Sequence, residues 1–325
     1  MIDVDTGAAR STVIRDLQIE TNATGIQHLS GAFELRNCRV IVRSAMDFNA
    51  GIYFKAVSRG DLPPDVVTVE DCTLLVEYTG DTPEGTPPDV DVILADSGSR
   101  YRELVIRQCE IRNDVPNSIS NGIETRSTTA RMTIHDNRIH TQGIGIVLPN
   151  HVGAVDIRDN TVWSGGCGIT LGTKTQERSN IIGNHITVDD RGLQVYPLFL
   201  QNHIGRSSST GISIGSTSAG VTAGFFLKEI IGRGTNFMVE KNVLMGNPKY
   251  GIAMVDSPEP EKFGPPTPNN SHKNTITGND FTALKAKSDI ALGASTYDNR
   301  IFGNVGVESI FREAGDEDRN DISND

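Results

Sequence analysis

The sequence has no long apolar run and few aromatic residues. No stretch reaches the roughly 18 consecutive apolar residues of a membrane-spanning helix, so no membrane span is expected. Aromatic side chains make up only 6% of the 325 residues, whereas glycine occurs 33 times. This composition favours many short strands joined by tight turns over a helical bundle. The N-terminus also lacks a basic segment followed by an apolar run, so no secretion signal is visible.

Positive charge is scarce as well. The chain carries 30 Lys and Arg against 41 Asp and Glu, which gives a formal net charge of -11. Nucleic acids and anionic membranes attract clustered positive charge, so nucleic acid is not expected as a partner. An anionic glycan would need a local group of Lys or Arg side chains, or a bridging cation.

Sequence motifs of the common metal and nucleophile sites are missing. The chain has no CxxC or HExxH spacing, no Gly-rich phosphate loop and no nucleophile elbow. Cys38, Cys72 and Cys109 occupy one position in the phrases LRNCRV, VEDCTL and IRQCEI. We interpret these three cysteines as small apolar side chains stacked in the core. Nothing near Cys167 in the sequence would activate its thiol.

What the sequence does contain is a repeat. Between positions 134 and 186 a short phrase with an Asn between apolar residues occurs three times, at Asn137, Asn160 and Asn184. Eight residues after each Asn comes a glycine with an apolar strand, at Gly145-Ile146, Gly168-Ile169 and Gly192-Leu193. The resulting period of 23 to 24 residues indicates a repeat architecture. Each repeat offers three short strands, which bury their apolar residues only by pairing in parallel with neighbouring repeats.

The Asn position serves as a ruler for the whole chain. In order, it is filled by Leu17, Cys38, Cys72, Cys109, Asn137, Asn160, Asn184, Asn202, Asn242, Asn279 and Asn304, with a partial turn near Asn324. Asn tolerates the left-handed backbone angles of a bend, and its amide can hydrogen-bond to the same amide one turn away. The predicted fold is therefore an all-β parallel β-helix of about 11 to 12 turns with an internal Asn/Cys ladder. A single domain over residues 1–325 is expected.

The phrase of apolar, polar, Asn, polar and apolar residues followed by Gly-Ile resembles the repeats of the pectin-lyase-like superfamily. The resemblance covers nearly the whole chain and implies a single-stranded right-handed helix with an extracellular or cell-surface location. That superfamily includes polysaccharide lyases, glycoside hydrolases, epimerases and phage tailspikes. Its enzymes place their substrate groove on the sheet of Gly-Ile strands, so the resemblance implies a polysaccharide as partner.

Strand alternation predicts which side chains of the Gly-Ile strands face outward. On turns two and four these outward side chains are charged or aromatic, namely Tyr53, Lys55, Glu124 and Arg126. Asp47 and Asn49 lie in the bend before the strand that contains Tyr53, so they would flank the same patch. The two turns should lie roughly 10 Å apart, about two sugar units. We predict Tyr53 as a stacking platform, Lys55 and Arg126 as carboxylate ligands and Glu124 as acid or base; an exposed ion-pair patch is the alternative.

A second candidate is the pair Asp189 and Asp190 in VDDRGLQV. It resembles the Asp pair that polygalacturonases carry before the same strand, where two carboxylates flank the glycosidic bond. On the strand that would follow, Gln194 and Tyr196 are expected to face outward as substrate-binding residues. The sequence departs from that family at Thr210, which stands at the position where polygalacturonases have His. The alternative is a pair of Asp residues in an ordinary bend.

Metal ligands are sparse. Asp89 and Asp91 could supply oxygen ligands for Ca²⁺, although no repeat-encoded calcium spacing accompanies them. His185 and His203 follow adjacent Asn positions and should be outward neighbours, which fits a solvated column better than a metal site. No cofactor is therefore assigned, and Ca²⁺ stays an open alternative.

Two functional hypotheses follow. The first is a carbohydrate-active protein that binds a polysaccharide along the Gly-Ile sheet. If it is an enzyme, a polysaccharide lyase acting by β-elimination comes first and a glycoside hydrolase or epimerase second. The second hypothesis is a non-catalytic structural or adhesive module of a surface or tail-like assembly. Neither terminus shows a capping helix, so a second copy or a neighbouring domain could cover the ends of the helix.

Overall fold

The computed structural model describes residues 1–5, 11–44, 49–55, 65–79, 90–95, 101–115, 120–125, 129, 131–151, 153–173, 178–189, 210–214, 235–254, 270–313 and 319–323. The regular elements of this part of the chain are all β-strands. Within it, therefore, no helix is long and apolar enough to cross a membrane.

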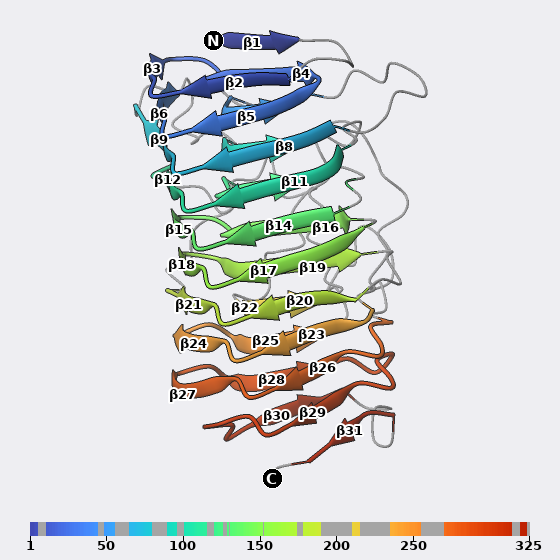
Figure 1. The fold of residues 1–325 in the computed structure, drawn as a ribbon. Coiled ribbons are helices and arrows are strands. Elements are labelled where there is room, and N and C mark those ends of the chain that lie inside the picture. Colours follow the sequence, from blue (N-terminus) through green and yellow to red (C-terminus); the bar gives the residue numbers. More distant parts are fainter. Residues whose placement is uncertain are drawn as a thin grey trace, which may run out of the picture.

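The strands form three parallel sheets, named here A, B and C (Figure 1). Sheet A contains β1 (Ile2–Asp5), β4 (Ile26–Ser30), β7 (Ala50–Phe54), β10 (Asp91–Ala95), β13 (Ile123–Thr125), β16 (Ile146–His151), β19 (Cys167–Thr173), β22 (Thr210–Ile214), β25 (Tyr250–Met254), β28 (Ser288–Leu292) and β30 (Ile310–Arg312). Sheet B contains β2 (Ser11–Arg15), β5 (Ala32–Arg36), β8 (Asp65–Glu70), β11 (Tyr101–Arg107), β14 (Arg131–His135), β17 (Ala154–Arg158), β20 (Ser179–Ile182), β23 (Phe237–Glu240), β26 (Thr275–Thr277), β29 (Arg300–Phe302) and β31 (Asp321–Ile322). Sheet C contains β3 (Gln18–Thr21), β6 (Arg39–Ser44), β9 (Thr73–Tyr78), β12 (Glu110–Asn113), β15 (Arg138–Thr141), β18 (Thr161–Ser164), β21 (His185–Val188), β24 (Val243–Gly246) and β27 (Asp280–Leu284).

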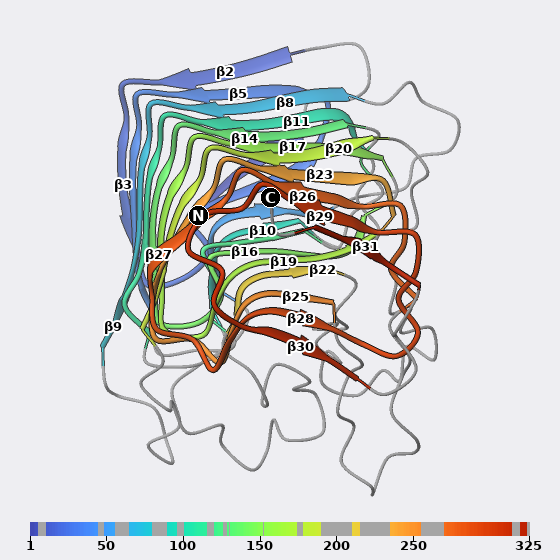
Figure 2. The same ribbon diagram turned by 90° about the horizontal axis from the view of Figure 1, so that it is seen from below.

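The first nine turns of the chain contribute one strand to each sheet, and the last two contribute β28 to β31 to sheets A and B. The molecule is therefore a parallel β-helix, as predicted. Seen along the helix axis, sheets A and B lie opposite each other and sheet C joins them on one side (Figure 2). One column of isoleucines faces the core from sheet A through Ile26, Ile52, Ile93, Ile123, Ile146, Ile169, Ile212, Ile252 and Ile290. All nine are fully buried. The Gly-Ile phrase therefore marks the sheet A strand, as expected.

The first position of the Gly-Ile phrase needs glycine for a steric reason. A Cβ added to Gly145 would lie 2.6 Å from the carbonyl oxygen of Gly168 on the next turn. At Gly51 the same atom would lie 2.7 Å from the carbonyl oxygen of Val92. Both separations are far shorter than a van der Waals contact, so glycine lets the turns approach at the start of sheet A.

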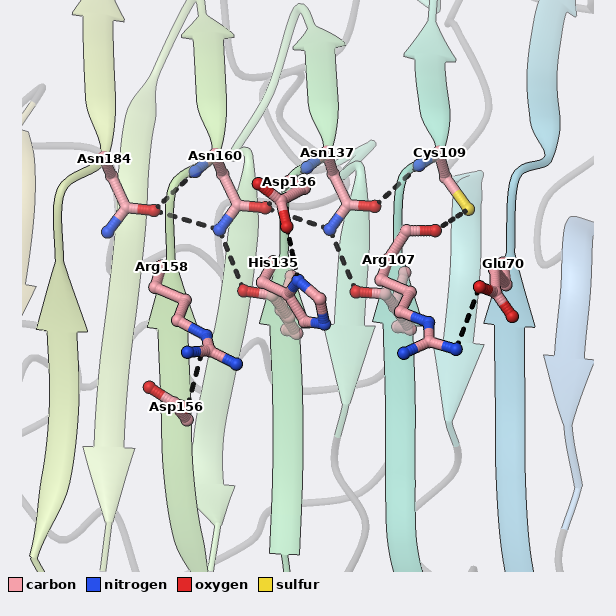
Figure 3. A network of polar contacts seen from close by, with 12 residues as sticks. Glu70, Arg107, Cys109, His135, Asp136, Asn137, Asp156, Arg158, Asn160 and Asn184 are labelled. Carbon is pink, nitrogen blue, oxygen red and sulfur yellow. Dashed lines mark hydrogen bonds and ion pairs between the residues drawn. The ribbon is translucent and has the colours of Figure 1, made fainter.

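The predicted Asn ladder runs along the bend between sheets B and C (Figure 3). The Asn137 side-chain amide donates to Oδ1 of Asn160 at 2.9 Å and to the carbonyl oxygen of Ile106 at 3.0 Å. Asn160 repeats both contacts with Asn184 and Ile134. Every buried amide is thus satisfied by the turns on either side.

One detail of the predicted bend was wrong. The left-handed backbone belongs to the residue before each Asn, as at Asp136 with φ 57°, Asp159 with φ 54° and Gly183 with φ 68°. This preceding residue turns the chain, and the Asn itself points into the core to bond with its neighbours. Asp tolerates the left-handed region better than most side chains do.

Cysteines continue the ladder on the N-terminal turns, as predicted. The Cys109 thiol donates to the carbonyl oxygen of Val69 at 3.7 Å, and the Cys72 thiol donates to that of Leu35 at 3.7 Å. These carbonyls correspond to Ile106, which accepts from Asn137. The four cysteines are buried and keep their thiols outside any disulfide. Burial raises the pKa of the Cys38 thiol, so this group stays protonated as a donor.

The ladder also continues across a long connection. Asn184 donates directly to Oδ1 of Asn242 at 2.9 Å, so Asn242 is the next rung after Asn184, and Asn202 lies outside the described residues. Asn184 and Asn242 belong to adjacent turns although 58 residues separate them. A second ladder that the sequence reading missed joins Asn274, Asn299 and Asn320 at the bend before sheet B, with amide contacts of 2.9 and 2.8 Å.

Candidate functional site

The first predicted patch lies on the outer face of sheet A. Tyr53 of β7 pairs in register with Leu94 of β10, and Leu94 pairs with Glu124 of β13. Tyr53 and Glu124 are therefore two strands apart, roughly 10 Å, as expected. Tyr53 and Leu94 are half-buried, and Lys55 directly after β7 is exposed. Phe54 points inward and is fully buried, which confirms the predicted alternation.

Glu124 differs from the expected exposed charge. Its side chain faces outward from sheet A but is only 5% exposed. The Asn121 side-chain amide donates to Oε2 of Glu124 at 2.8 Å, and the Asn121 backbone N–H donates to Oδ1 of Asp91 at 2.9 Å. Asn121 thus joins two buried carboxylates from neighbouring turns. This arrangement contradicts the alternative of an exposed ion pair at Glu124.

The bends before sheet A are themselves held by polar side chains. Asn113, at the end of β12, donates to the backbone carbonyls of Val90 at 2.6 Å and Asn121 at 3.0 Å. The Val90 N–H donates to the hydroxyl oxygen of Ser120 at 3.1 Å. These contacts fix the backbone from which Asp91 and Asn121 project, because buried polar groups seek partners.

Sequence reasoning missed Leu94, Asn121 and Asp91 as parts of the patch. The strand β10 begins without a glycine, since Val92 stands at that position, and it was therefore absent from the set of Gly-Ile strands. The period of the repeat predicts a strand there, so spacing alone could have identified it.

Asn49 and Asp189 occupy bends. The Asn49 side-chain amide donates to the carbonyl oxygen of Asn22 at 3.4 Å, which ties the bend before β7 to the preceding turn. The backbone N–H of Asp189, just past β21, donates to the carbonyl oxygen of Ser164 at 2.9 Å. Five other predicted site residues lie outside the described residues, namely Asp47, Arg126, Asp190, Gln194 and Tyr196.

The strand predicted to follow the Asp pair falls outside the described residues. The sheet A strand that pairs with β19 is β22, in which Ile212 lies beside Ile169 and Ser213 beside Thr170. Gly192-Leu193 and Asp190 lie outside the described residues. The polygalacturonase-like Asp pair therefore stays a prediction.

Of the two predicted histidine neighbours, only His185 belongs to the described residues, and His203 lies outside them. His185 of β21 pairs with Thr161 on one side and with Val243 on the other. Val243 therefore follows His185 on the next turn of sheet C. Among the described residues, no group of three or more His, Cys, Asp or Glu side chains could hold a metal ion. Asp89, a predicted Ca²⁺ ligand, lies outside them.

Comparison with protein families identifies the repeat. Residues 12–220 match the NosD family, described as periplasmic copper-binding protein, which is more than half of the 325 residues. A search of curated proteins gave no match. NosD proteins are right-handed parallel β-helices of the pectin-lyase-like type, in agreement with the described sheets. The chain belongs to the NosD family of periplasmic β-helix proteins.

Proposed function

We propose that this chain is a polysaccharide-binding β-helix whose ligand lies across the outer face of sheet A. The observation that carries the proposal is the in-register column of Tyr53, Leu94 and Glu124. It places an aromatic ring, an aliphatic side chain and a carboxylate on three adjacent strands. Sugars present C–H faces that pack on such apolar groups and hydroxyls that donate to carboxylates.

Lys55 supports a uronate as the preferred sugar. Its exposed ammonium group follows Tyr53 by two residues and can pair with a carboxylate on the ligand. If the protein is also an enzyme, β-elimination is the first choice, because a cation beside the uronate stabilises the charge that develops when a base removes the α-proton. Glu124 would be that base, held in place by Asn121. Hydrolysis or epimerisation comes second.

The family description raises copper as an alternative ligand. The softest donors that lie together among the described residues are the three stacked cysteines. They do not fit a copper site, because Cys38, Cys72 and Cys109 are 3%, 2% and 2% exposed and each thiol donates to a backbone carbonyl. Copper binds the thiolate, whereas these thiols serve the scaffold as donors. We therefore keep a glycan as the proposed ligand of this chain. The proposed location is outside the cytoplasm, because the family is described as periplasmic.

Binding to a panel of uronate-containing and neutral polysaccharides tests the proposal. Tyr53→Ala should weaken binding about tenfold, since a stacked ring contributes up to ~1.5 kcal/mol, whereas Tyr53→Phe should bind nearly as well as the wild type. The same samples should be monitored for unsaturated and reducing ends, and Glu124→Gln should abolish either activity. Equal binding by Tyr53→Ala, or no binding to any glycan, would favour a structural or adhesive module instead.

A further inference from the structure

Sheet C carries a groove on its outer face, away from the patch on sheet A. One part, of about 500 Å³, is lined by side chains of β12, β15 and β18, including Arg112, Arg138 and Trp163. A second part, of about 340 Å³, continues over β6 and β9 and shares Glu110 and Arg112 with the first. The groove therefore follows the helix axis over five adjacent strands.

Two columns of outward side chains form the walls of this groove. The first column is in register through Arg39, Thr73, Glu110, Arg138 and Thr161. The second is in register through Leu75, Arg112, His140 and Trp163. Alternate residues, such as Ile111 and Ile139, point into the core and form the floor of the sheet. Long side chains on both columns thus leave a channel between them.

Guanidinium groups outnumber carboxylates in the lining of the groove, although the protein as a whole is strongly acidic. The lining contains Arg39, Arg112 and Arg138 against Glu110, while Asp114 and Glu77 lie beside Arg112. Arg112 is held by Asp114, whose Oδ1 lies 2.8 Å from its Nε. No ion pair of Arg39 or Arg138 occurs among the described residues, and both side chains are exposed. Because the whole chain carries a net charge of -11, this local excess of arginine points to an anionic ligand.

An aromatic pair lies at one end of the groove. The rings of His140 and Trp163 stack with centroids 4.1 Å apart and planes inclined by 10°. Trp163 is half-buried, and the next residue of this column is the small Thr187. Such a ring offers a platform for the C–H face of a sugar or for another flat group.

These features together lead us to propose that the sheet C groove binds an acidic polysaccharide along the helix axis. Five strands at about 4.8 Å spacing give a length of roughly 19 Å, which accommodates about four sugar units. Three arginines over this length suit a carboxylate or sulfate on some of the sugars, and Glu110 can accept hydrogen bonds from hydroxyls. A nucleic acid fits less well, because its phosphates are closely spaced and would meet Glu110 and an acidic protein.

This groove is independent of the site proposed on sheet A. Figure 2 shows the two sheets on different sides of the helix, so one glycan segment does not occupy both. The binding experiment is therefore carried out in the Tyr53→Ala background, with polygalacturonate and dextran sulfate as acidic probes, dextran as the neutral probe and single-stranded DNA as the other polyanion.

Arg138→Ala should weaken binding of an acidic probe about tenfold, and Trp163→Ala should weaken it to a similar degree. The matched control is Arg131→Ala, which removes an exposed arginine from sheet B of the same turn and should leave binding within about twofold of the background. Three outcomes would contradict the proposed binding in the groove. They are equal losses for Arg131→Ala and Arg138→Ala, tighter binding of DNA or dextran than of the acidic probes, and no binding of either acidic probe. If Tyr53→Ala alone abolishes binding, Arg138→Ala is made in the wild type instead, and unchanged binding there would leave only the sheet A proposal standing.

Discussion

Glu70 shows how one residue couples three turns of the helix. On the outer face of sheet B it lies in register between Arg36 and Arg107. Its Oε1 is 2.9 Å from Nη2 of Arg107, and its Oε2 is 2.8 Å from Nη2 of Arg36. The hydrogen bond from Arg107 lowers the pKa of Glu70, although burial acts in the opposite direction. The side chain is only 11% exposed, so solvent screens this contact less than it screens most surface ion pairs.

Glu70→Gln should therefore destabilise the protein by about 1 to 2 kcal/mol near pH 7. A carboxyl whose pKa is lower in the folded state stabilises the fold above its unfolded pKa of roughly 4.3, and this contribution is lost as the pH falls through the folded value. The difference between wild type and variant in urea unfolding should thus shrink from pH 5 downwards. Glu110→Gln is the control, since Glu110 is exposed on sheet C. Parallel stability curves at all pH values would show that Glu70 contributes no ion-pair energy.

At the scale of the elements, the Asn and Cys ladder joins neighbouring strands through side chains as well as backbone. Asn160 accepts from both the backbone N–H and the side-chain amide of Asn137, and it donates to the carbonyl oxygen of Ile134. Cys109 donates to carbonyl oxygens through its thiol, to that of Val69 on the preceding turn at 3.7 Å and to that of Arg107 at 3.1 Å. The two residue types therefore fill one position with different numbers of hydrogen bonds.

Asn160→Ala should cost about 3 kcal/mol or more, because it leaves the Asn137 amide and the Ile134 carbonyl buried without their partners. Asn160→Cys should cost less, since a thiol at this position can donate to the Ile134 carbonyl as Cys109 does to Val69. Chemical denaturation of both variants measures the difference. If the two substitutions cost the same, the thiol contacts of the N-terminal turns carry no stabilising energy, and the cysteines are there only for their size.

The sequence predicted those elements that repeat at a fixed distance. The period predicted the parallel helix, the Gly-Ile strands and most rungs of the ladder, because each turn must place the same kind of side chain at the same point. Spacing did not predict that Asn242 bonds directly to Asn184, because 58 residues separate the two and a rung is defined by its contact with the neighbouring turn. The residue before each Asn, and not the Asn itself, has the left-handed backbone angles. The spacing of the repeat does not show which of the two residues makes the bend.

Prediction of the candidate sites was weaker for a related physical reason. Alternation predicted that Tyr53 and Glu124 face outward, but not that Asn121 and Asp91 would bury Glu124 in a hydrogen-bonded network. The groove on sheet C depends on pairs such as His140 with Trp163, which lie 23 residues apart in sequence and become neighbours only through the register of the turns. Following the outward column of every sheet, and not of sheet A alone, would have brought them together.

At the scale of the whole molecule, each turn contacts only its two neighbours. Inner strands such as β17 and β18 pair on both sides, whereas β2 and β3 pair on one side only. The large apolar side chains that are exposed gather on the end turns as well, with Val13 at 44% and Leu17 at 41% on one and Phe311 at 41% on the other. Stability in such a solenoid is close to a sum of turn and interface contributions, so the ends should open before the middle.

Hydrogen exchange followed by mass spectrometry should therefore show slow exchange in β14 to β18 and fast exchange in β2, β3 and β31. Asn160→Ala weakens the contacts between the turns that meet at Asn160, so it should raise exchange in β15 and β18 while the already fast ends stay unchanged. An equal slowing of exchange at both ends of the wild type, increasing with protein concentration, would contradict this picture. It would mean that copies of the chain stack end to end and cover Val13, Leu17 and Phe311, which makes the exposed apolar residues part of an interface.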